Sequence, residues 1–325
     1  MKSIVKIFAV FLISINYFSI SFANSIPSSF ADLAERLMPS VVNISTRTTV
    51  TTRSNPLPFE FPPGSPFEDM FGTPQQRQTS ALGSGFIIDE EGIVITNNHV
   101  IQGAQDIVVR VNGDKDYKAK VLGADAGMDL AVLKIESDEK FKPVNFGNSD
   151  KARIGDWVIA IGNPFGLGGT VTAGIISARN RSIGLSRYED YIQTDASINQ
   201  GNSGGPLFNM AGDVIGINTA ILGQSGSIGI GFAIPSNSAQ KVIKQLIEFG
   251  ETKRGWLGVR IQVVDQGIAD AENLDKPRGA LVASVAENSP SDKGGIKPGD
   301  IILEFDGKPI NCLLYTSDAA DERLS

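Results

Sequence analysis

A serine between glycines is the first residue in this sequence that could do chemistry. Ser203 stands in Gly201-Asn202-Ser203-Gly204-Gly205-Pro206-Leu207. Glycine permits the tight turn and the close backbone approach that present such a hydroxyl. A serine hydroxyl is a weak nucleophile and needs a base to take its proton. The chain contains one histidine, His99, so nucleophilic chemistry at Ser203 with a histidine base predicts His99 as that base.

The order of the candidate residues along the chain separates the possible arrangements of such a site. The Gly-x-Ser-x-Gly pattern also fits the nucleophile elbow of α/β-hydrolases, but no histidine follows the serine here, as that fold requires. A subtilisin-like order needs an earlier acid such as Asp89, and the alternating helices of that fold are missing. The chymotrypsin-like order is met by His99, Asp129 and Ser203. Each residue alone is commonly structural, whereas the three in this order favour a catalytic triad.

Several segments resemble the HtrA (Do-like) serine protease family. Three of them carry the candidate residues: Thr96-Asn97-Asn98-His99-Val100, Asp129-Leu130-Ala131-Val132-Leu133-Lys134 and Gly201-Asn202-Ser203-Gly204-Gly205-Pro206-Leu207. Two more are Gly83-Ser84-Gly85-Phe86-Ile87 and Gly162-Asn163-Pro164-Phe165-Gly166. The resemblance extends from about Phe30 to Ile310. It implies an all-β protease domain, a chymotrypsin-like double six-stranded β-barrel, followed by a partial PDZ-like α+β domain.

The pattern of short apolar segments also predicts barrels. These segments are rich in Val and Ile and are separated by Gly, Asn and Asp, as in closed antiparallel sheets. Two barrels that divide near Pro143 place His99 and Asp129 in the first and Ser203 in the second, with a substrate peptide between them. The expected strands are 41–45, 85–89, 92–96, 106–111, 118–124, 130–135, 157–161, 171–177, 191–194, 214–219 and 231–234.

At 325 residues the length indicates about two domains. Residues 24–250 are predicted to form the protease domain. It is closed by a helix over Ser236–Phe249, with Ser236 as its cap and Gly250 at its end. A polar linker leads to residues 255–311, which resemble the N-terminal part of a PDZ domain. The helix that completes such a domain and a second PDZ copy are missing from the pattern. Residues 312–325 continue no PDZ pattern and are interpreted as a non-native tail derived from a sequencing adapter.

Residues 1–23 read as a secretory signal peptide. Lys2 and Lys6 form its positive end, an apolar stretch follows, and Ser21-Phe22-Ala23 is a small-x-small cleavage site. An uncleaved membrane anchor is the alternative, since the apolar stretch approaches the lower end of a spanning helix at roughly 17 residues. The single cysteine, Cys312, excludes a disulfide framework. We expect a periplasmic protein with no stable membrane span after cleavage.

The segment Asn55–Gln78 combines many prolines with four phenylalanines, Phe59, Phe61, Phe67 and Phe71. Such a segment cannot pair as a central strand, so it is predicted to be a surface loop. Exposed apolar side chains often mark contacts, and the family resemblance implies that this insertion meets other subunits. A trimer-based homo-oligomer is therefore expected.

The predicted chemistry is acyl transfer. Ser203 attacks the scissile carbonyl, His99 takes and returns the proton, and Asp129 orients the ring while it stays ionised. The oxyanion hole is predicted at Gly201, Asn202 and Ser203, with the N–H groups of Gly201 and Ser203 as donors.

The resemblance to the HtrA family also predicts which residues recognise the substrate. Ser197, six residues before the nucleophile, is the predicted base of the specificity pocket, and residues 221–230 are a predicted wall. Because Ser197 carries no charge, no demand for Arg or Lys in the substrate is expected. The resemblance implies cleavage after small aliphatic residues in unfolded proteins or peptides. It also implies that the N–H groups of Leu257, Gly258 and Val259 bind a peptide carboxylate.

Composition and motifs exclude other classes. A net charge of −7 without a dense Lys/Arg block argues against nucleic acid as a partner. Residues 162–169 are glycine-rich but lack the ending of a phosphate-binding loop. One histidine and one cysteine make a zinc site improbable, so no cofactor or metal is expected. The predicted function is an ATP-independent serine endopeptidase for misfolded or damaged envelope proteins. The alternative is a periplasmic chaperone or peptide-binding scaffold in which proteolysis is secondary.

Overall fold

The computed structural model describes residues 27–52, 75–111, 115–163, 169–184, 188–199, 201–221 and 227–310. The predicted signal peptide, most of the proline-rich insertion and the predicted tail lie outside these residues. Within the described ranges, no helix is long and apolar enough to cross a membrane.

The first barrel is a closed antiparallel sheet in the order β1-β2-β3-β6-β5-β4. Its interior is lined by fully buried aliphatic side chains that include Val42, Ile44, Val94 and Leu133. The alternating burial along β4 is the period of two expected for a strand with one face on a core. Its strands are β1 (Val41–Thr52), β2 (Gln75–Ile87), β3 (Ile93–Thr96), β4 (Asp106–Val111), β5 (Lys115–Asp125) and β6 (Leu130–Ile135).

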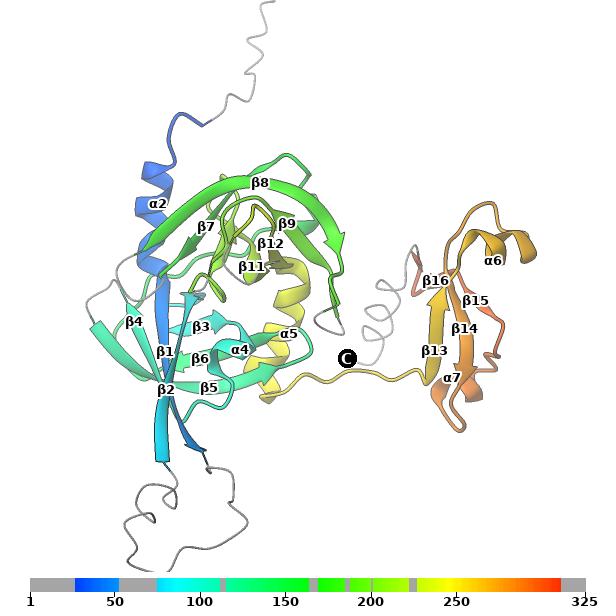
Figure 1. Ribbon diagram of the computed structural model, residues 1–325, viewed down its shortest axis with the longest axis horizontal. Coiled ribbons are helices and arrows are strands. Elements are labelled where there is room, and N and C mark those ends of the chain that lie inside the picture. The colour runs from blue at the N-terminus through cyan, green and yellow to red at the C-terminus, as the bar shows by residue number, and fades with distance from the viewer. Residues whose placement is uncertain are drawn as a thin grey trace, which may run out of the picture.

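Strands β1 and β2 are longer than the sequence predicted. They pair from Val41 with Phe86 out to Thr52 with Gln75, and β1 pairs with β4 only up to Arg47. The two strands therefore extend beyond the barrel as a two-stranded arm (Figure 1). The last four residues of the predicted loop, Gln75–Gln78, belong to β2, so the loop prediction was wrong there. No proline follows Pro74 in this stretch, so every residue keeps the N–H that strand pairing needs.

The second barrel is also closed, in the order β10-β11-β12-β9-β8-β7. Read from its first strand, this order is β7-β8-β9-β12-β11-β10, which is the topology of the first barrel. The predicted double six-stranded barrel is therefore confirmed, although the three-residue β10, which begins at Pro206, was not predicted. Its strands are β7 (Trp157–Gly162), β8 (Thr170–Arg181), β9 (Tyr191–Thr194), β10 (Pro206–Phe208), β11 (Val214–Ile221) and β12 (Gly231–Pro235).

A separate hydrophobic cluster joins the two barrels. It combines Phe86 and Leu130 of the first barrel with Ile159 and Phe208 of the second, all fully buried. Residues on helix α5 (Ser236–Phe249) extend the same cluster. Because these side chains come from both barrels and the helix, burial of one apolar surface stabilises the whole unit.

Helix α5 occupies the predicted span, and Ala239, Val242, Ile243 and Leu246 form its buried face. It ends at Gly250, which has a left-handed φ of 77° and donates its N–H to the carbonyl of Leu246. The predicted cap was wrong: Pro235 occupies the N-cap position, and the hydroxyl of Ser236 instead donates to the carbonyl of Gly147 at 2.7 Å.

Shorter helices complete this unit. Helix α2 (Ala31–Leu37) and the 3₁₀ turn η1 (Met38–Ser40) precede β1, and α4 (Asn98–Ile101) follows β3. Another 3₁₀ turn, η2 (Ser149–Lys151), precedes β7. The ring of Phe30 lies 5.7 Å from that of Trp157, and Arg36 donates to the carbonyl of Ala211 at 2.9 Å. The N-terminal helix is thus attached to the second barrel.

The residues after 255 form a small α+β unit. Its sheet has the order β13-β14-β15, and β16 and β17 pair separately. Val264, Ala269, Ala280, Val282 and Ile310 are its buried apolar residues. The elements are β13 (Val259–Val263), α6 (Gln266–Ala271), β14 (Ala280–Val285), α7 (Pro290–Lys293), β15 (Ile301–Ile302), β16 (Glu304–Phe305) and β17 (Lys308–Pro309).

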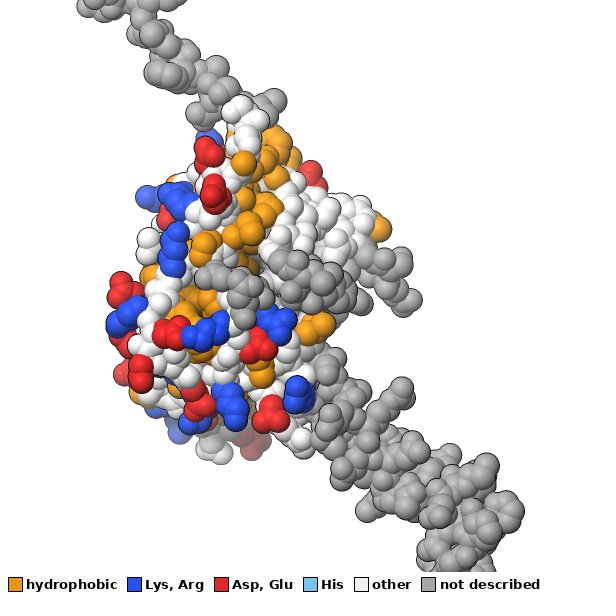
Figure 2. All heavy atoms as spheres, turned by 90° about the vertical axis from the view of Figure 1, so that its left-hand side faces the viewer, with side chains coloured by type: hydrophobic (Ala, Val, Ile, Leu, Met, Phe, Trp, Pro, Cys, Tyr) orange, Lys and Arg blue, Asp and Glu red, His pale blue; other side chains and the backbone are white. Residues whose placement is uncertain are grey.

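Charged side chains on the first barrel are arranged in opposite-sign pairs. Arg110 pairs with Asp116 at 2.6 Å, and Lys115 and Lys140 pair with Glu139 and Glu91. Figure 2 shows red and blue side chains interspersed over the lower part of one face, below a group of hydrophobic atoms. Such exposed pairs contribute little stability, typically about 0–1 kcal/mol each.

Candidate active site

The structure brings His99 and Asp129 into direct contact. His99 lies on α4, and Asp129 ends the turn between β5 and β6. Nδ1 of His99 lies 2.6 Å from Oδ2 of Asp129, while the backbone N–H of His99 donates to Oδ1 at 2.9 Å. A ring whose Nδ1–H donates to a carboxylate keeps Nε2 as its proton acceptor, which is the form a general base needs. The His99 side chain is 46% exposed, so the ring reaches the surface of the protein.

The backbone of Asp129 adopts a conformation that is rare for residues with a side chain. Its φ is 55°, in the left-handed region. The carbonyl of Asp129 accepts hydrogen bonds from the backbone N–H of Asn98 at 3.1 Å and from Nδ2 of Asn97 at 2.8 Å. The residues just before the histidine thereby hold the aspartate in this conformation.

A residue of the second barrel also contacts the carboxylate of Asp129. The hydroxyl of Thr219, on β11, donates to Oδ2 of Asp129 at 2.7 Å. The preceding residue, Asn218, accepts the N–H of Gly204 at 2.8 Å. Consecutive residues of one strand therefore contact the aspartate and the serine loop. Nothing in the sequence pattern singled out Thr219, because its partner is distant in the chain.

The loop of Ser203 packs tightly against the first barrel. Gly204 has a φ of 83°, and a Cβ there would lie 2.3 Å from the carbonyl oxygen of Ser84 and from Oγ1 of Thr96. It would also lie 3.0 Å from the N atom of Asn97. Glycine is required at this position for both its conformation and its contacts. The serine loop is therefore a neighbour of the segment that leads into His99.

Among the described residues, the backbone hydrogen bonds of this loop leave two N–H groups without an acceptor. The N–H of Asn202 donates to Asn199 at 3.0 Å, that of Gly204 donates to Asn218, and that of Gly205 donates to Asn202 at 3.0 Å. Within the described residues, the N–H groups of Gly201 and Ser203 have no acceptor. These are the predicted oxyanion-hole donors, whereas the N–H of Asn202 is already used.

Ser203 is partly buried, and its hydroxyl forms no hydrogen bond within the described part of the chain. Hydrogen bonds between nucleophile and base are often long in substrate-free sites and tighten when substrate binds. The described contacts thus place Ser203, His99 and Asp129 at the junction of the barrels without a direct bond from Ser203.

Ser197 contacts the same loop through its backbone carbonyl. Its carbonyl accepts a hydrogen bond from the hydroxyl of Thr172 at 3.0 Å and from Nδ2 of Asn202 at 3.4 Å. Asn199 accepts the N–H of Ser227 at 2.9 Å, which ties the described end of the predicted pocket wall to this segment. Residues 222–226 of that wall lie outside the described residues.

The predicted carboxylate-binding residues lie at the start of the second unit. Gly258 has a φ of 79°, and a Cβ on it would meet Cβ of Ser289 at 2.2 Å. Its carbonyl accepts the N–H of Ala286 at 2.7 Å. The N–H groups of Leu257 and Gly258 donate to no group within the described residues, while Val259 begins β13.

An ion pair attaches the linker between the two units to the turn that carries Asp129. Arg254 lies 2.7 Å from Oδ2 of the buried Asp125 and 4.3 Å from the centre of the Tyr188 ring. Oδ1 of Asp125 accepts the N–H of Met128 at 2.8 Å, one residue before Asp129. Burial raises the pKa of the Asp125 carboxyl, but the interactions with Arg254, with Thr252 and with the backbone N–H of Met128 together outweigh this effect and hold the pKa below its usual value.

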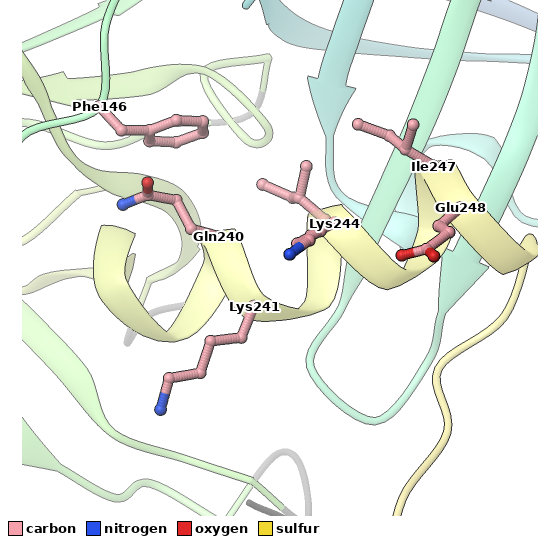
Figure 3. A pocket seen from close by; sticks show the side chains of 7 residues that line it. Phe146, Gln240, Lys241, Lys244, Ile247 and Glu248 are labelled. Carbon is pink, nitrogen blue, oxygen red and sulfur yellow. The ribbon is translucent and has the colours of Figure 1, made fainter. Parts of the chain in front are cut away.

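A separate hollow lies beside α5. It is lined by Phe146, Gln240, Lys241, Ile243, Lys244, Ile247 and Glu248 (Figure 3). None of the predicted site residues lines it. No group of three or more His, Cys, Asp or Glu side chains within the described ranges is placed to hold a metal ion.

Comparisons with known proteins define the class to which this site belongs. A family model of the trypsin-like peptidase domain matches residues 83–217, and a PDZ domain model matches residues 255–319. The solved structure of the HtrA-type protease AlgW with decapeptide is 42% identical, has a TM-score of 0.73 and covers 91% of each chain. AlgW with tripeptide is 40% identical with a TM-score of 0.75, and the match covers 91% of this chain and 89% of that one. The fold is therefore that of a trypsin-like serine protease domain joined to a PDZ domain.

Curated relatives agree with this class. Probable periplasmic serine endoproteases described as DegP-like are 50% identical over 303 residues in Marinomonas sp. (strain MWYL1) and 47% identical over 290 residues in Hahella chejuensis (strain KCTC 2396). These matches cover 89% and 86% of this chain but 64% and 62% of the relatives. The chain thus spans less than two thirds of their length. It belongs to the HtrA family of serine proteases, as the sequence motifs predicted.

Proposed function

We propose that this chain is an ATP-independent serine endopeptidase with Ser203 as nucleophile. Oγ of Ser203 forms a bond to the scissile carbonyl carbon while Nε2 of His99 takes the hydroxyl proton. His99 then gives this proton to the leaving amine as the C–N bond breaks, which leaves an acyl-enzyme. Water, deprotonated by His99, releases the acyl group. Asp129 orients the ring and stabilises the imidazolium.

The observation that carries this proposal is the 2.6 Å contact between His99 and Asp129 beside the packed loop of Ser203. This histidine is the only one in the chain, so no competing base exists among histidines. The N–H groups of Gly201 and Ser203, which have no acceptor in the described part of the chain, support the same chemistry, because the oxyanion of a tetrahedral intermediate needs such donors.

The substrates are proposed to be unfolded or damaged proteins of the cell envelope, cut after small aliphatic residues. Ser197 offers an uncharged base to the specificity pocket, and the N–H groups of Leu257, Gly258 and Val259 bind a peptide carboxylate in the second unit. The names of the relatives support a periplasmic location, reached through the predicted signal peptide. A trimer-based homo-oligomer is the proposed assembly.

Digestion of unfolded casein by the wild type and the S203A variant tests the activity. Loss of the nucleophile is expected to lower kcat by about 10⁶-fold. The S236A variant is a matched control, since this buried serine contacts none of the proposed catalytic residues. A fluorophosphonate probe that labels wild type but not S203A identifies the reacting serine. Equal activity of wild type and S203A would refute the mechanism. Absence of activity and of labelling in both, with retained binding of unfolded casein, would favour the chaperone or scaffold alternative.

A peptide series tests the specificity. Substrates that differ only before the cut, with Ala, Val, Arg or Asp, are expected to give the highest kcat/KM for Ala and Val. Preference for Arg would contradict the assignment of Ser197 as the pocket base.

A further inference from the structure

Every polar atom of Ser84, on β2, is used in contacts around the candidate oxyanion hole. Its N–H donates to the carbonyl of Ser203 at 2.9 Å, and its hydroxyl donates to the carbonyl of Gly201 at 2.5 Å. The same hydroxyl oxygen accepts the N–H of Asn163 at 2.7 Å, and the Ser84 carbonyl accepts the hydroxyl of Thr96 at 2.7 Å. Ser84 is fully buried. One residue of the first barrel therefore contacts the nucleophile loop on both sides of Asn202.

These contacts fix alternate peptide groups of the loop. The peptide group between Gly201 and Asn202 is held at its carbonyl by Ser84 and at its N–H by Asn199. The peptide group between Ser203 and Gly204 is held at its carbonyl by Ser84 and at its N–H by Asn218. Within the described residues, the group between them, from Asn202 to Ser203, is held only at its carbonyl, by Gly205. Its N–H is one of the proposed oxyanion donors.

We infer that Ser84 is a positioning residue for the oxyanion hole, and this inference depends on the proposed function. If the Gly201–Asn202 peptide group rotated, it would lose its hydrogen bonds to Ser84 and Asn199 together. The two adjacent peptide groups, which carry the N–H groups of Gly201 and Ser203, would then lose their orientation. Fixed donors stabilise the oxyanion because they need no reorganisation during the reaction.

The local sequence allows this close approach. A Cβ on Gly83 would lie 2.7 Å from side-chain atoms of Val100, and one on Gly85 would lie 2.8 Å from the carbonyl oxygen of Ile95. Nδ2 of Asn43, opposite Ser84 on β1, donates to the carbonyls of Gly83 at 3.3 Å and Asn163 at 2.8 Å. The flanking glycines thus let β2 lie against its neighbours, and Asn43 secures the segment that donates to the Ser84 hydroxyl.

The experiment compares S84A with S236A, two changes that each remove a hydroxyl from a fully buried serine. The hydroxyl of Ser236 also donates to a backbone carbonyl, that of Gly147, but lies outside the site. Steady-state hydrolysis of a peptide substrate gives kcat and KM, and fluorophosphonate labelling gives an independent rate at Ser203. Thermal midpoints of both variants report any general loss of stability.

We expect S84A to lower kcat by about 10- to 100-fold, less than direct loss of an oxyanion donor, with KM changed less than about threefold. The labelling rate is expected to fall in parallel, and S236A is expected to keep wild-type kinetics. S84T retains the hydroxyl and is expected to recover most of the lost kcat.

Equal kinetic losses in S84A and S236A would overturn the inference, as would an S84T variant no faster than S84A. A loss confined to KM would also contradict it, because a positioned oxyanion donor acts in the transition state. If wild-type protein neither hydrolyses peptide nor labels at Ser203, the proposed function itself fails, and that result differs from each of these outcomes.

Discussion

The two barrels share one strand topology but build their parts of the candidate site in different ways. His99 lies in the connection between the third and fourth strands of the first barrel, β3 and β4. Ser203 lies in the corresponding connection of the second barrel, between β9 and β10. In the first, the chain forms the short helix α4, and His99 is oriented by a side chain, Asp129. In the second, the chain forms a glycine turn whose peptide groups are held by backbone hydrogen bonds and by the hydroxyl of the buried Ser84.

This difference follows from what each residue must present. A base must expose a ring nitrogen, and the His99 side chain remains 46% exposed. A nucleophile that shares its loop with an oxyanion hole must present a hydroxyl and backbone N–H groups together, which demands fixed peptide orientation. Side-chain hydrogen bonds suffice to orient the ring of a base. Fixing the peptide groups of the nucleophile loop requires burial of that loop.

The D129N variant tests the first connection and has the largest expected effect among the tests of this comparison. It keeps the shape of the side chain but removes the charge that selects the tautomer of His99, so kcat is expected to fall by about 10⁴-fold. Peptide hydrolysis measures this loss. D116N, which breaks the exposed pair with Arg110 on the same barrel, is the control and should retain activity. A D129N enzyme with wild-type kcat would remove Asp129 from the proposed triad.

Replacing one glycine in each of the two connections by alanine tests how tightly each connection is packed. Gly204 and Gly103 both have positive φ, at 83° and 73°, but a Cβ on Gly103 meets nothing within 4 Å. G103A is expected to cost about 1 kcal/mol of unfolding free energy from backbone strain alone. G204A adds overlap with Ser84 and Thr96 and is expected to cost about 3 kcal/mol or more. Chemical denaturation measures both values, and equal costs would contradict the tight packing of the serine loop.

The D125N variant tests whether the Asp129 turn depends on the linker. Loss of the partly buried pair with Arg254 is expected to cost about 2 kcal/mol at neutral pH. The pKa of Asp125 is lowered in the folded protein, so its carboxylate stabilises the fold above the unfolded pKa of about 4. This contribution is lost as the pH falls through the lower, folded pKa.

Denaturation of wild type and D125N between neutral and acidic pH checks whether the charged form of Asp125 stabilises the fold. The difference in unfolding free energy is expected to be constant above about pH 5 and to shrink at lower pH. A difference that grows on acidification would show that the charged form of Asp125 does not stabilise the fold.

Much of the architecture could be predicted from the sequence because it is encoded locally. The alternating Val and Ile residues predicted the strands and the division of the barrels near Pro143, and the apolar stripe predicted α5 with Gly250 at its end. The candidate triad followed from residue type and chain order, since one histidine left one choice of base. Its catalytic roles and the domain boundaries stay predictions.

The three-dimensional structure alone decided the contacts between distant segments. No pattern near Thr219, Ser84 or Asp125 indicated that they would contact Asp129, the loop of Ser203 and the linker, because their partners lie far along the chain. The same holds for Ser236, which local rules assigned as a helix cap and which instead donates to the carbonyl of Gly147. Residue type and spacing determine which groups could react. Packing determines which peptide groups are paired, because a buried N–H or carbonyl must find its partner wherever the fold provides one.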